Sequence, residues 1–254
     1  MATIHQQTGS RPASEAVRGT ARDLGVGLAL ALGAVGATWW LLGLPASYPL
    51  IGLAFYGSLA GLVLRTLPSG TRGPGIGPAN RVTLGRAALS TPILALAVQP
   101  GTLGTIGLWW VIALSTAVLV LDGLDGRVAR RTGSESAFGA RFDMELDAAL
   151  ILALSVLVWR SGKVGAWVLL IGLMRYAFVA ASWRWPALRA ELPPSQRRRV
   201  VCVVQGVVLL VALGPIIPTW MAVAVTAAGL SALGYSFAVD VRWTLSQGAS
   251  QVQD

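Results

Sequence analysis

The stretch of sequence that decides the fold covers residues 122–147. It reads Asp122-Gly-Leu-Asp125-Gly126-Arg-Val-Ala129-Arg130, then eight further residues, then Gly139-Ala-Arg-Phe-Asp143-Met-Glu-Leu-Asp147. Its four aspartates form two pairs, the first separated by three positions and the second by four. Each spacing places both members of a pair on one face of a helix. Two facing helices would therefore present four carboxylates to one point.

A cluster of this kind requires positive charge. Carboxylates gathered at one point repel one another, so some must take up protons or the group must bind a cation. Ligands that are all oxygen favour a hard divalent ion such as Mg²⁺, Mn²⁺ or Ca²⁺. Long apolar runs flank the stretch on both sides, and ionisable groups at membrane helices generally mark a functional site. The pattern therefore predicts a metal centre near the ends of two membrane helices.

The composition of the whole chain indicates a membrane protein. Hydrophobic residues make up 54% of the 254 residues and charged residues only 12%, with a mean hydropathy of +0.65. A soluble domain carries about 25% charged residues, so a soluble globular fold is excluded. The single cysteine, Cys202, excludes an internal disulfide.

Eight apolar runs are long enough to cross a bilayer, which takes about 17–25 residues each. They cover residues 24–44, 48–64, 82–99, 104–121, 140–159, 164–182, 200–217 and 219–241. The runs are continuous rather than alternating, which favours helices over strands. The predicted fold class is an all-α polytopic membrane protein. We expect a flexible tail over 1–23, a transmembrane helix pair over 24–65, a Gly/Pro-rich linker over 66–79, a six-helix membrane domain over 80–245 and a C-terminal tail over 246–254.

The positive charge lies mostly on one side of the predicted spans. The chain has 20 basic and 11 acidic residues, a formal net charge of +9. With eight spans, only Arg160 and Lys163 fall on the opposite side, and Arg175 lies inside a span. The positive-inside rule makes the arginine-rich side cytoplasmic, so we expect both termini and residues 122–147 there. Arginines at span ends attract anionic lipid head groups, which explains the net charge without nucleic-acid binding.

The stretch over residues 122–147 resembles the signature of the CDP-alcohol phosphotransferase family. The family pattern is D-x2-D-G-x2-A-R-x8-G-x3-D-x3-D, and this chain agrees with it at every fixed position. A second stretch, Pro78-Ala-Asn80-Arg-Val-Thr83-Leu-Gly-Arg86, resembles the Pro-Asn-x-x-Thr-x-x-Arg start of the family's first core helix, with Ala79 inserted. The resemblance implies a six-helix core over roughly residues 78–245 and a homodimer. The apolar runs before that core predict two extra N-terminal transmembrane helices.

The resemblance also implies roles for the four aspartates. Asp122, Asp125 and Asp143 would bind one or two Mg²⁺ or Mn²⁺ ions, and Asp147 would act as general base and could also bind metal. A divalent ion suits a pyrophosphate donor, because the negative charge on the phosphate oxygens increases as CMP leaves. A hydroxyl nucleophile needs a base to take its proton. The alternative, that these carboxylates only cap helices or pair with nearby arginines, does not explain their spacing.

Four further residues of the stretch resemble donor-binding positions of the family. They are Gly126, Ala129, Arg130 and Gly139. Small residues leave room for a nucleotide, and a guanidinium suits phosphate oxygens. The alternatives are ordinary helix packing through small residues and an arginine that follows the positive-inside rule.

Three other arginines are candidates for binding the acceptor. Arg175 lies inside a predicted span, where an arginine usually faces a cavity, although its side chain could instead extend to the interface. Arg198 and Arg199 precede a span, in a position that resembles the acceptor-phosphate segment of related phosphatidylglycerophosphate synthases and inositol-phosphate transferases. A charged loop at the lipid surface is the alternative.

The resemblance implies transfer of a phosphatidyl group from CDP-diacylglycerol to a hydroxyl acceptor, with release of CMP. The arginines favour a phosphorylated polyol such as glycerol 3-phosphate. An inositol phosphate, a free alcohol and phosphatidylglycerol are alternative acceptors, and a different CDP-alcohol is an alternative donor. A cation-coupled transporter remains a separate hypothesis, but transporter sites tend to lie near the midplane between repeats, whereas this cluster lies near a span end. A catalytically silent scaffold would not need the intact pattern.

Overall fold

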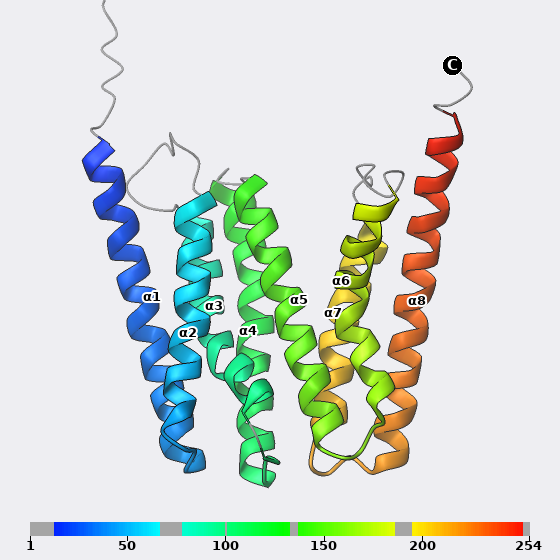
Figure 1. Cartoon of the computed structure of the whole chain (residues 1–254), viewed down its shortest axis with the longest axis horizontal. Helices are drawn as coiled ribbons and strands as arrows, with labels where there is room; N and C mark the ends of the chain where they lie inside the picture. The colour runs from blue at the N-terminus through cyan, green and yellow to red at the C-terminus, as the bar shows by residue number, and fades with distance from the viewer. Residues whose placement is uncertain (1–12, 67–77, 100, 133–136, 186–194, 251–254) are drawn as a thin grey trace, which may run out of the picture.

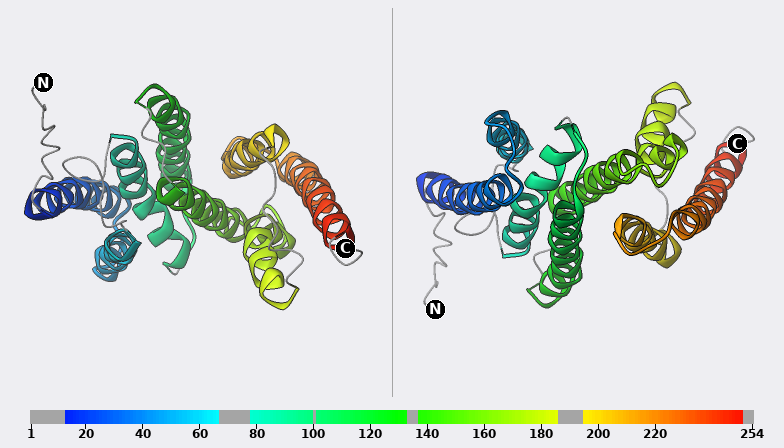
Figure 2. Two further views of the ribbon diagram at one scale, coloured as in Figure 1. Left: turned by 90° about the horizontal axis from the view of Figure 1, so that it is seen from above. Right: turned by 90° about the horizontal axis from the view of Figure 1, so that it is seen from below.

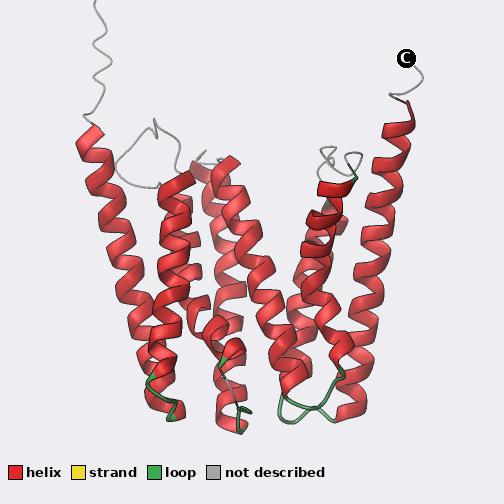
Figure 3. Ribbon diagram, viewed as in Figure 1, coloured by secondary structure: helices red, strands yellow, loops and turns green. Residues whose placement is uncertain are grey.

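The computed structural model describes residues 13–66, 78–99, 101–132, 137–185 and 195–250, and all regular structure in these ranges is helical (Figure 3). Within these ranges, eight α-helices and one short 3₁₀ helix follow one another. They are α1 (Ala13–Leu42), α2 (Ser47–Thr66), α3 (Pro78–Val98), α4 (Thr105–Thr132), α5 (Ala137–Arg160), η1 (Ala166–Val168), α6 (Leu169–Arg184), α7 (Gln196–Leu213) and α8 (Thr219–Ser250). The predicted all-α fold is confirmed.

Successive α-helices run in opposite directions (Figure 1). The first residues of α1, α3, α5 and α7 and the last residues of α2, α4, α6 and α8 therefore lie at one end of the molecule, which we call the site end. The arginine-rich segments of the sequence lie at this end, as the alternation of the predicted spans requires.

Five of the helices, within the described residues, are long and apolar enough to cross a membrane, and they indicate a membrane protein. The spans are Arg18–Leu42, Arg81–Val98, Thr105–Gly123, Ala166–Arg184 and Thr219–Thr244. Two of the remaining helices carry charge within a membrane-length segment: α5 holds Asp143, Glu145 and Asp147, and α7 begins with the arginines of residues 197–199. The three acidic residues, Arg197 and Arg198 make ion pairs with neighbouring helices, which lowers the cost of placing them in or beside a bilayer.

Two helices extend beyond the apolar runs that predicted them. α1 begins at Ala13, within the tail expected over residues 1–23, and α8 continues to Ser250, within the tail expected over 246–254. Adding a residue to an existing helix gains one hydrogen bond without a new nucleation cost, so a span continues into adjoining polar residues. Of the linker expected over residues 66–79, Thr66 ends α2 and Pro78 begins α3, and most of the rest lies outside the described residues.

Helix α3 is the most buried of the candidate spans. In its spanning segment 67% of the residues are buried, compared with 17–28% in the other four spans. α1, α2, α4 and α5 all pack against it, and the views along the helices place it among them (Figure 2). Its residues Ile93 and Leu96 belong to the same hydrophobic core as Leu150 and Leu154 of α5. A side chain on this helix can therefore contact α4 and α5 without contacting lipid.

Polar contacts join the N-terminal helix pair to this core. The buried hydroxyl of Tyr48 on α2 donates to the Pro92 carbonyl of α3 at 3.0 Å. The indole N–H of Trp110 on α4 donates to the hydroxyl of Thr38 on α1 at 2.8 Å. Breaking a buried hydrogen bond leaves an unsatisfied polar group and costs about 1–3 kcal/mol. The helix pair is therefore fixed to α3 and α4 by specific contacts.

The two basic residues predicted for the opposite side lie at helix ends there. Arg160, the last residue of α5, donates to the Leu96 carbonyl near the end of α3 at 3.0 Å. The Lys163 ammonium donates to the Ile217 carbonyl, just beyond α7, at 3.1 Å. Positive charge at a helix C-terminus offsets the helix dipole and satisfies terminal carbonyls. Both residues thus have a structural role at the end away from the site.

Candidate active site

Three carboxylates from two helices meet near the site end. Asp122 lies in the last third of α4, and Asp143 and Asp147 lie one turn apart on α5. One oxygen from each of the three lies within 4.8 Å of the other two. The structure thus brings together three of the four aspartates that the sequence predicts to converge.

A buried arginine lies against all three carboxylates. The guanidinium of Arg86, on α3, is 2.8 Å from Asp122 and 2.6 Å from Asp147, and it also donates to Asp143. The Arg86 side chain is 0% exposed, whereas the carboxylates are 24–35% exposed. Burying a charge is costly unless it is paired, so the carboxylates make this position possible for an arginine. The three-helix cluster of Arg86, Asp122, Asp143 and Asp147 is called the acid–arginine cluster below.

The sequence alone gives Arg86 no role in the site. Arg86 and Asp143 are 57 positions apart, and only the packing of α3 against α5 brings them together. The one signal in the sequence was the resemblance of the stretch ending in Arg86 to the start of the family's first core helix. A family pattern marks such a residue but does not say what it touches.

The other predicted residues of the stretch lie on the same two helices. α4 stays helical through Thr132, so Asp125 lies one turn beyond Asp122 on the same helix face. Gly139 lies in the first turn of α5, four positions before Asp143. The side chains of Asp125, Ala129 and Arg130 and the surroundings of Gly126 lie outside the described part of the structure.

Arg175 of α6 pairs with an acidic residue outside the acid–arginine cluster. Its guanidinium binds the carboxylate of Glu145 on α5. The two helices approach closely, because a Cβ at Gly172 would lie 2.4 Å from the backbone of α5. Arg175 is therefore held where α6 packs against α5, the helix that also carries Asp143 and Asp147.

Two of the three arginines that begin α7 contact α8. Arg197 pairs with Asp240 and donates to the Ser236 carbonyl. Arg198 reaches the same Asp240 carboxylate at 3.4 Å. Arg199 is exposed and is the most accessible of the three to an anionic ligand.

The donor set of the acid–arginine cluster suits a divalent cation. Carboxylate oxygens are the ligands that Mg²⁺ and Mn²⁺ prefer, and here three of them converge from a rigid pair of helices. A cationic group already lies among them, because all three contact the Arg86 guanidinium. The residues present thus fit a metal ion of this kind.

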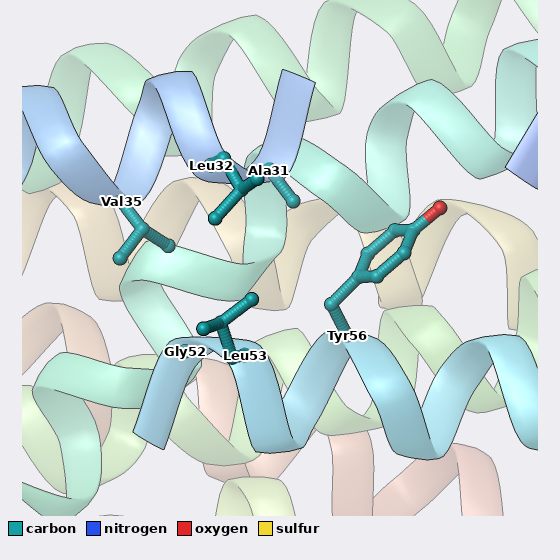
Figure 4. Close-up of a pocket in the computed structure, with 6 residues that line it drawn as sticks. All are labelled: Ala31, Leu32, Val35, Gly52, Leu53 and Tyr56. Atoms are coloured by element: carbon teal, nitrogen blue, oxygen red, sulfur yellow. The ribbon is translucent and has the colours of Figure 1, made fainter. Parts of the chain in front are cut away.

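A small apolar pocket lies elsewhere, between α1 and α2 (Figure 4). It is lined by Ala31, Leu32, Val35, Gly52, Leu53 and Tyr56. None of these residues is charged, and neither α1 nor α2 carries a member of the acid–arginine cluster. The pocket is a packing gap within the N-terminal pair and does not suit a nucleotide or a phosphate.

Comparisons with known proteins identify the family. The family model for CDP-alcohol phosphatidyltransferase matches residues 78–239, more than half of the chain, from the start of α3 into the second half of α8. Comparisons with curated proteins and with solved structures gave no match. The matched region contains every member of the acid–arginine cluster and leaves α1 and α2 outside. The chain therefore belongs to the CDP-alcohol phosphatidyltransferase family, a family of membrane phosphotransferases that use divalent metals.

Proposed function

We propose that this protein transfers a phosphatidyl group from CDP-diacylglycerol to a hydroxyl acceptor, with release of CMP, in phospholipid synthesis. The observation that carries the proposal is the convergence of Asp122, Asp143 and Asp147 from α4 and α5 within 4.8 Å. Within this family, such a group of oxygen ligands suits the charge of a pyrophosphate donor. The acceptor oxygen would form a bond to the phosphatidyl phosphorus as the bond from that phosphorus to CMP breaks.

Asp147 is the proposed general base. Its carboxylate is 24% exposed, so an acceptor hydroxyl can reach it, and it would take the hydroxyl proton as the new bond forms. Arg86 holds the carboxylate oriented through a hydrogen bond of 2.6 Å. Asp122, Asp125 and Asp143 would hold Mg²⁺ or Mn²⁺, as one or two ions, which when bound would neutralise the pyrophosphate charge.

The donor nucleotide and phosphates would lie along the end of α4 and the start of α5. Gly126, Ala129 and Gly139 are small, and the absence of larger side chains would let the nucleotide approach the helix backbone. Arg130 would bind a donor phosphate through its planar guanidinium. These assignments follow the family pattern.

A phosphorylated polyol is the proposed acceptor, with glycerol 3-phosphate first. Arg175, Arg198 and Arg199 are the proposed acceptor-binding residues. Arg199 is exposed, which supports a ligand-binding role at the start of α7. Arg198 contacts Asp240 at 3.4 Å and would share that partner with the ligand. Arg175 would have to exchange or share its Glu145 partner to bind a phosphate, so its assignment depends on movement of that ion pair.

The protein would act as a multi-pass protein of the cell membrane, as a homodimer, with both termini and the site on the cytoplasmic side. The positive-inside rule supports this orientation, because the arginine-rich segments lie at the site end.

A transfer assay tests the proposal. Full-length protein in membranes or detergent would be given CDP-diacylglycerol labelled in its lipid part, Mn²⁺ and one acceptor at a time: glycerol 3-phosphate, an inositol phosphate, glycerol or phosphatidylglycerol. We expect labelled product and CMP in equal amounts, and the highest rate with glycerol 3-phosphate. A higher rate with another acceptor would replace the acceptor assignment. No transfer to any acceptor, together with cation flux into sealed vesicles, would favour a transporter.

A further inference from the structure

The acid–arginine cluster contains a positive charge that the proposed chemistry does not use. Arg86 is one of the largest fully buried side chains in the described residues. Its guanidinium contacts the Oδ1 atom of each of Asp122, Asp143 and Asp147. An arginine remains charged under all ordinary conditions, so this charge is a permanent part of the site.

We propose that Arg86 is the internal counter-ion of the metal site: it holds the three carboxylates together before the metal binds, and it weakens the binding of the divalent ion. This inference rests on the proposed metal-dependent function. It concerns what the protein's own arginine does toward that ion.

The first half of the proposal follows from repulsion. Three carboxylates with oxygens within 4.8 Å of one another repel strongly when ionised. They come from two helices, and Arg86 comes from a third, so its contacts tie α3, α4 and α5 together at the site end. Without metal, the guanidinium is a cation that the structure places in contact with all three carboxylates. Removing its charge should destabilise the metal-free protein in particular.

The second half follows from the shared ligands. A divalent ion that binds the Oδ1 atoms would compete directly with the guanidinium. An ion that binds the other oxygens would still lie beside a positive charge in a partly buried site, where charges interact more strongly than in water. In both geometries Arg86 lowers the affinity for the metal. Metal binding is then reversible even though the site holds three carboxylates.

The test compares Arg86→Gln and Arg86→Lys with the wild type as full-length protein in detergent. Arg81→Gln is the matched control, because Arg81 lies five positions earlier on the same helix and pairs with Asp23 outside the cluster. Mn²⁺ affinity is measured by the loss of the free-ion signal in electron paramagnetic resonance. Thermal unfolding is followed by tryptophan fluorescence, once in EDTA and once in saturating Mn²⁺.

We expect Arg86→Gln to bind Mn²⁺ roughly tenfold more tightly than the wild type, because the opposing charge is gone. It should unfold at a lower temperature than the wild type in EDTA and recover most of the difference in Mn²⁺. Arg86→Lys, which keeps the charge, should bind Mn²⁺ within about threefold of the wild type. Arg81→Gln should show neither the tighter binding nor the selective loss of stability in EDTA.

Unchanged or weaker Mn²⁺ binding in Arg86→Gln would overturn the counter-ion role and leave the metal site standing. The same conclusion follows if Arg86→Gln stays unfolded in saturating Mn²⁺, since the ion should replace the missing charge. Failure of the wild type to bind Mn²⁺ at all would instead remove the metal site, and with it both proposals.

Discussion

Replacing Asp147 with asparagine separates the proposed base from the structure around it. Asparagine has the same size and still offers an oxygen to the Arg86 guanidinium, which lies 2.6 Å from Asp147. The Arg86 guanidinium keeps its charge, so the hydrogen bond remains charge-assisted, a class worth about 1.5–3 kcal/mol, although the charge of the acceptor is lost. Repulsion from Asp122 and Asp143 falls at the same time. The free energy of unfolding should therefore change by only about 1 kcal/mol.

The transfer rate should fall far more than the stability. Loss of a positioned base costs roughly 10²–10⁴-fold in rate, or about 3–5 kcal/mol of activation free energy. Initial rates of CMP release from CDP-diacylglycerol would be measured at saturating acceptor over a range of Mn²⁺ concentrations. Asp23→Asn is the control, because that carboxylate pairs with Arg81 on the neighbouring helix and lies outside the acid–arginine cluster.

Two outcomes would refute this reasoning. A rate for Asp147→Asn within a few-fold of the wild type would show that the carboxylate is not the base. Recovery of the wild-type rate at high Mn²⁺ would show that Asp147 contributes metal affinity and nothing else. An equal loss of activity in Asp23→Asn would mean that the assay reports damage to the helix packing rather than chemistry.

Three further outcomes are expected. Activity should vanish in excess EDTA and return with Mg²⁺ or Mn²⁺, because clustered carboxylates need a counter-cation for a pyrophosphate substrate; full turnover in EDTA would refute the metal site. Changing Arg198 and Arg199 together to glutamine should raise the acceptor KM roughly ten- to a hundredfold with little effect on the donor KM. The control Arg197→Gln, which breaks the pair with Asp240, should mainly lower the unfolding temperature. Kinetics with each substrate varied in turn distinguish a loss of acceptor binding from a loss of stability. Tyr48→Phe should destabilise the protein by about 1–3 kcal/mol by removing the buried bond to α3, and an unfolding temperature equal to that of the wild type would contradict this.

Much of the helical architecture could be predicted because apolar runs of membrane length specify helices directly. The ends of those helices could not, because polar residues continue a helix once it leaves the apolar layer. α4 shows this most clearly. Its apolar run ends near residue 121, but the helix continues to Thr132, so the first half of the aspartate stretch lies on the helix itself.

The candidate site was predictable only as far as local spacing reaches. The spacing of four between Asp143 and Asp147 specifies one face of α5 whatever else the chain does. The partner of each charged residue depends on which helices pack together, and no local pattern contains that information. Glu145 illustrates the limit. It lies two positions from each of the two aspartates and so on another face of α5, and no local pattern predicts that its carboxylate holds Arg175 of α6.

Helix α3 links the part of the chain that matches the family to the part that does not. It carries Arg86 against the carboxylates of α4 and α5 and, less than two turns later, Pro92, whose carbonyl accepts the hydrogen bond from Tyr48. Any displacement of α3 along its axis would therefore change both contacts together. The N-terminal pair lies outside the matched region, but through its contacts with α3 it holds the helix whose buried charge contacts the site carboxylates.

If Arg86 sets the metal affinity, as proposed above, loosening the N-terminal pair should alter the response of the protein to Mn²⁺ as well as its stability. Measuring the Mn²⁺ affinity of Tyr48→Phe beside that of Arg86→Gln tests this link, because a purely local role for α1 and α2 predicts a change in unfolding temperature with unchanged metal binding.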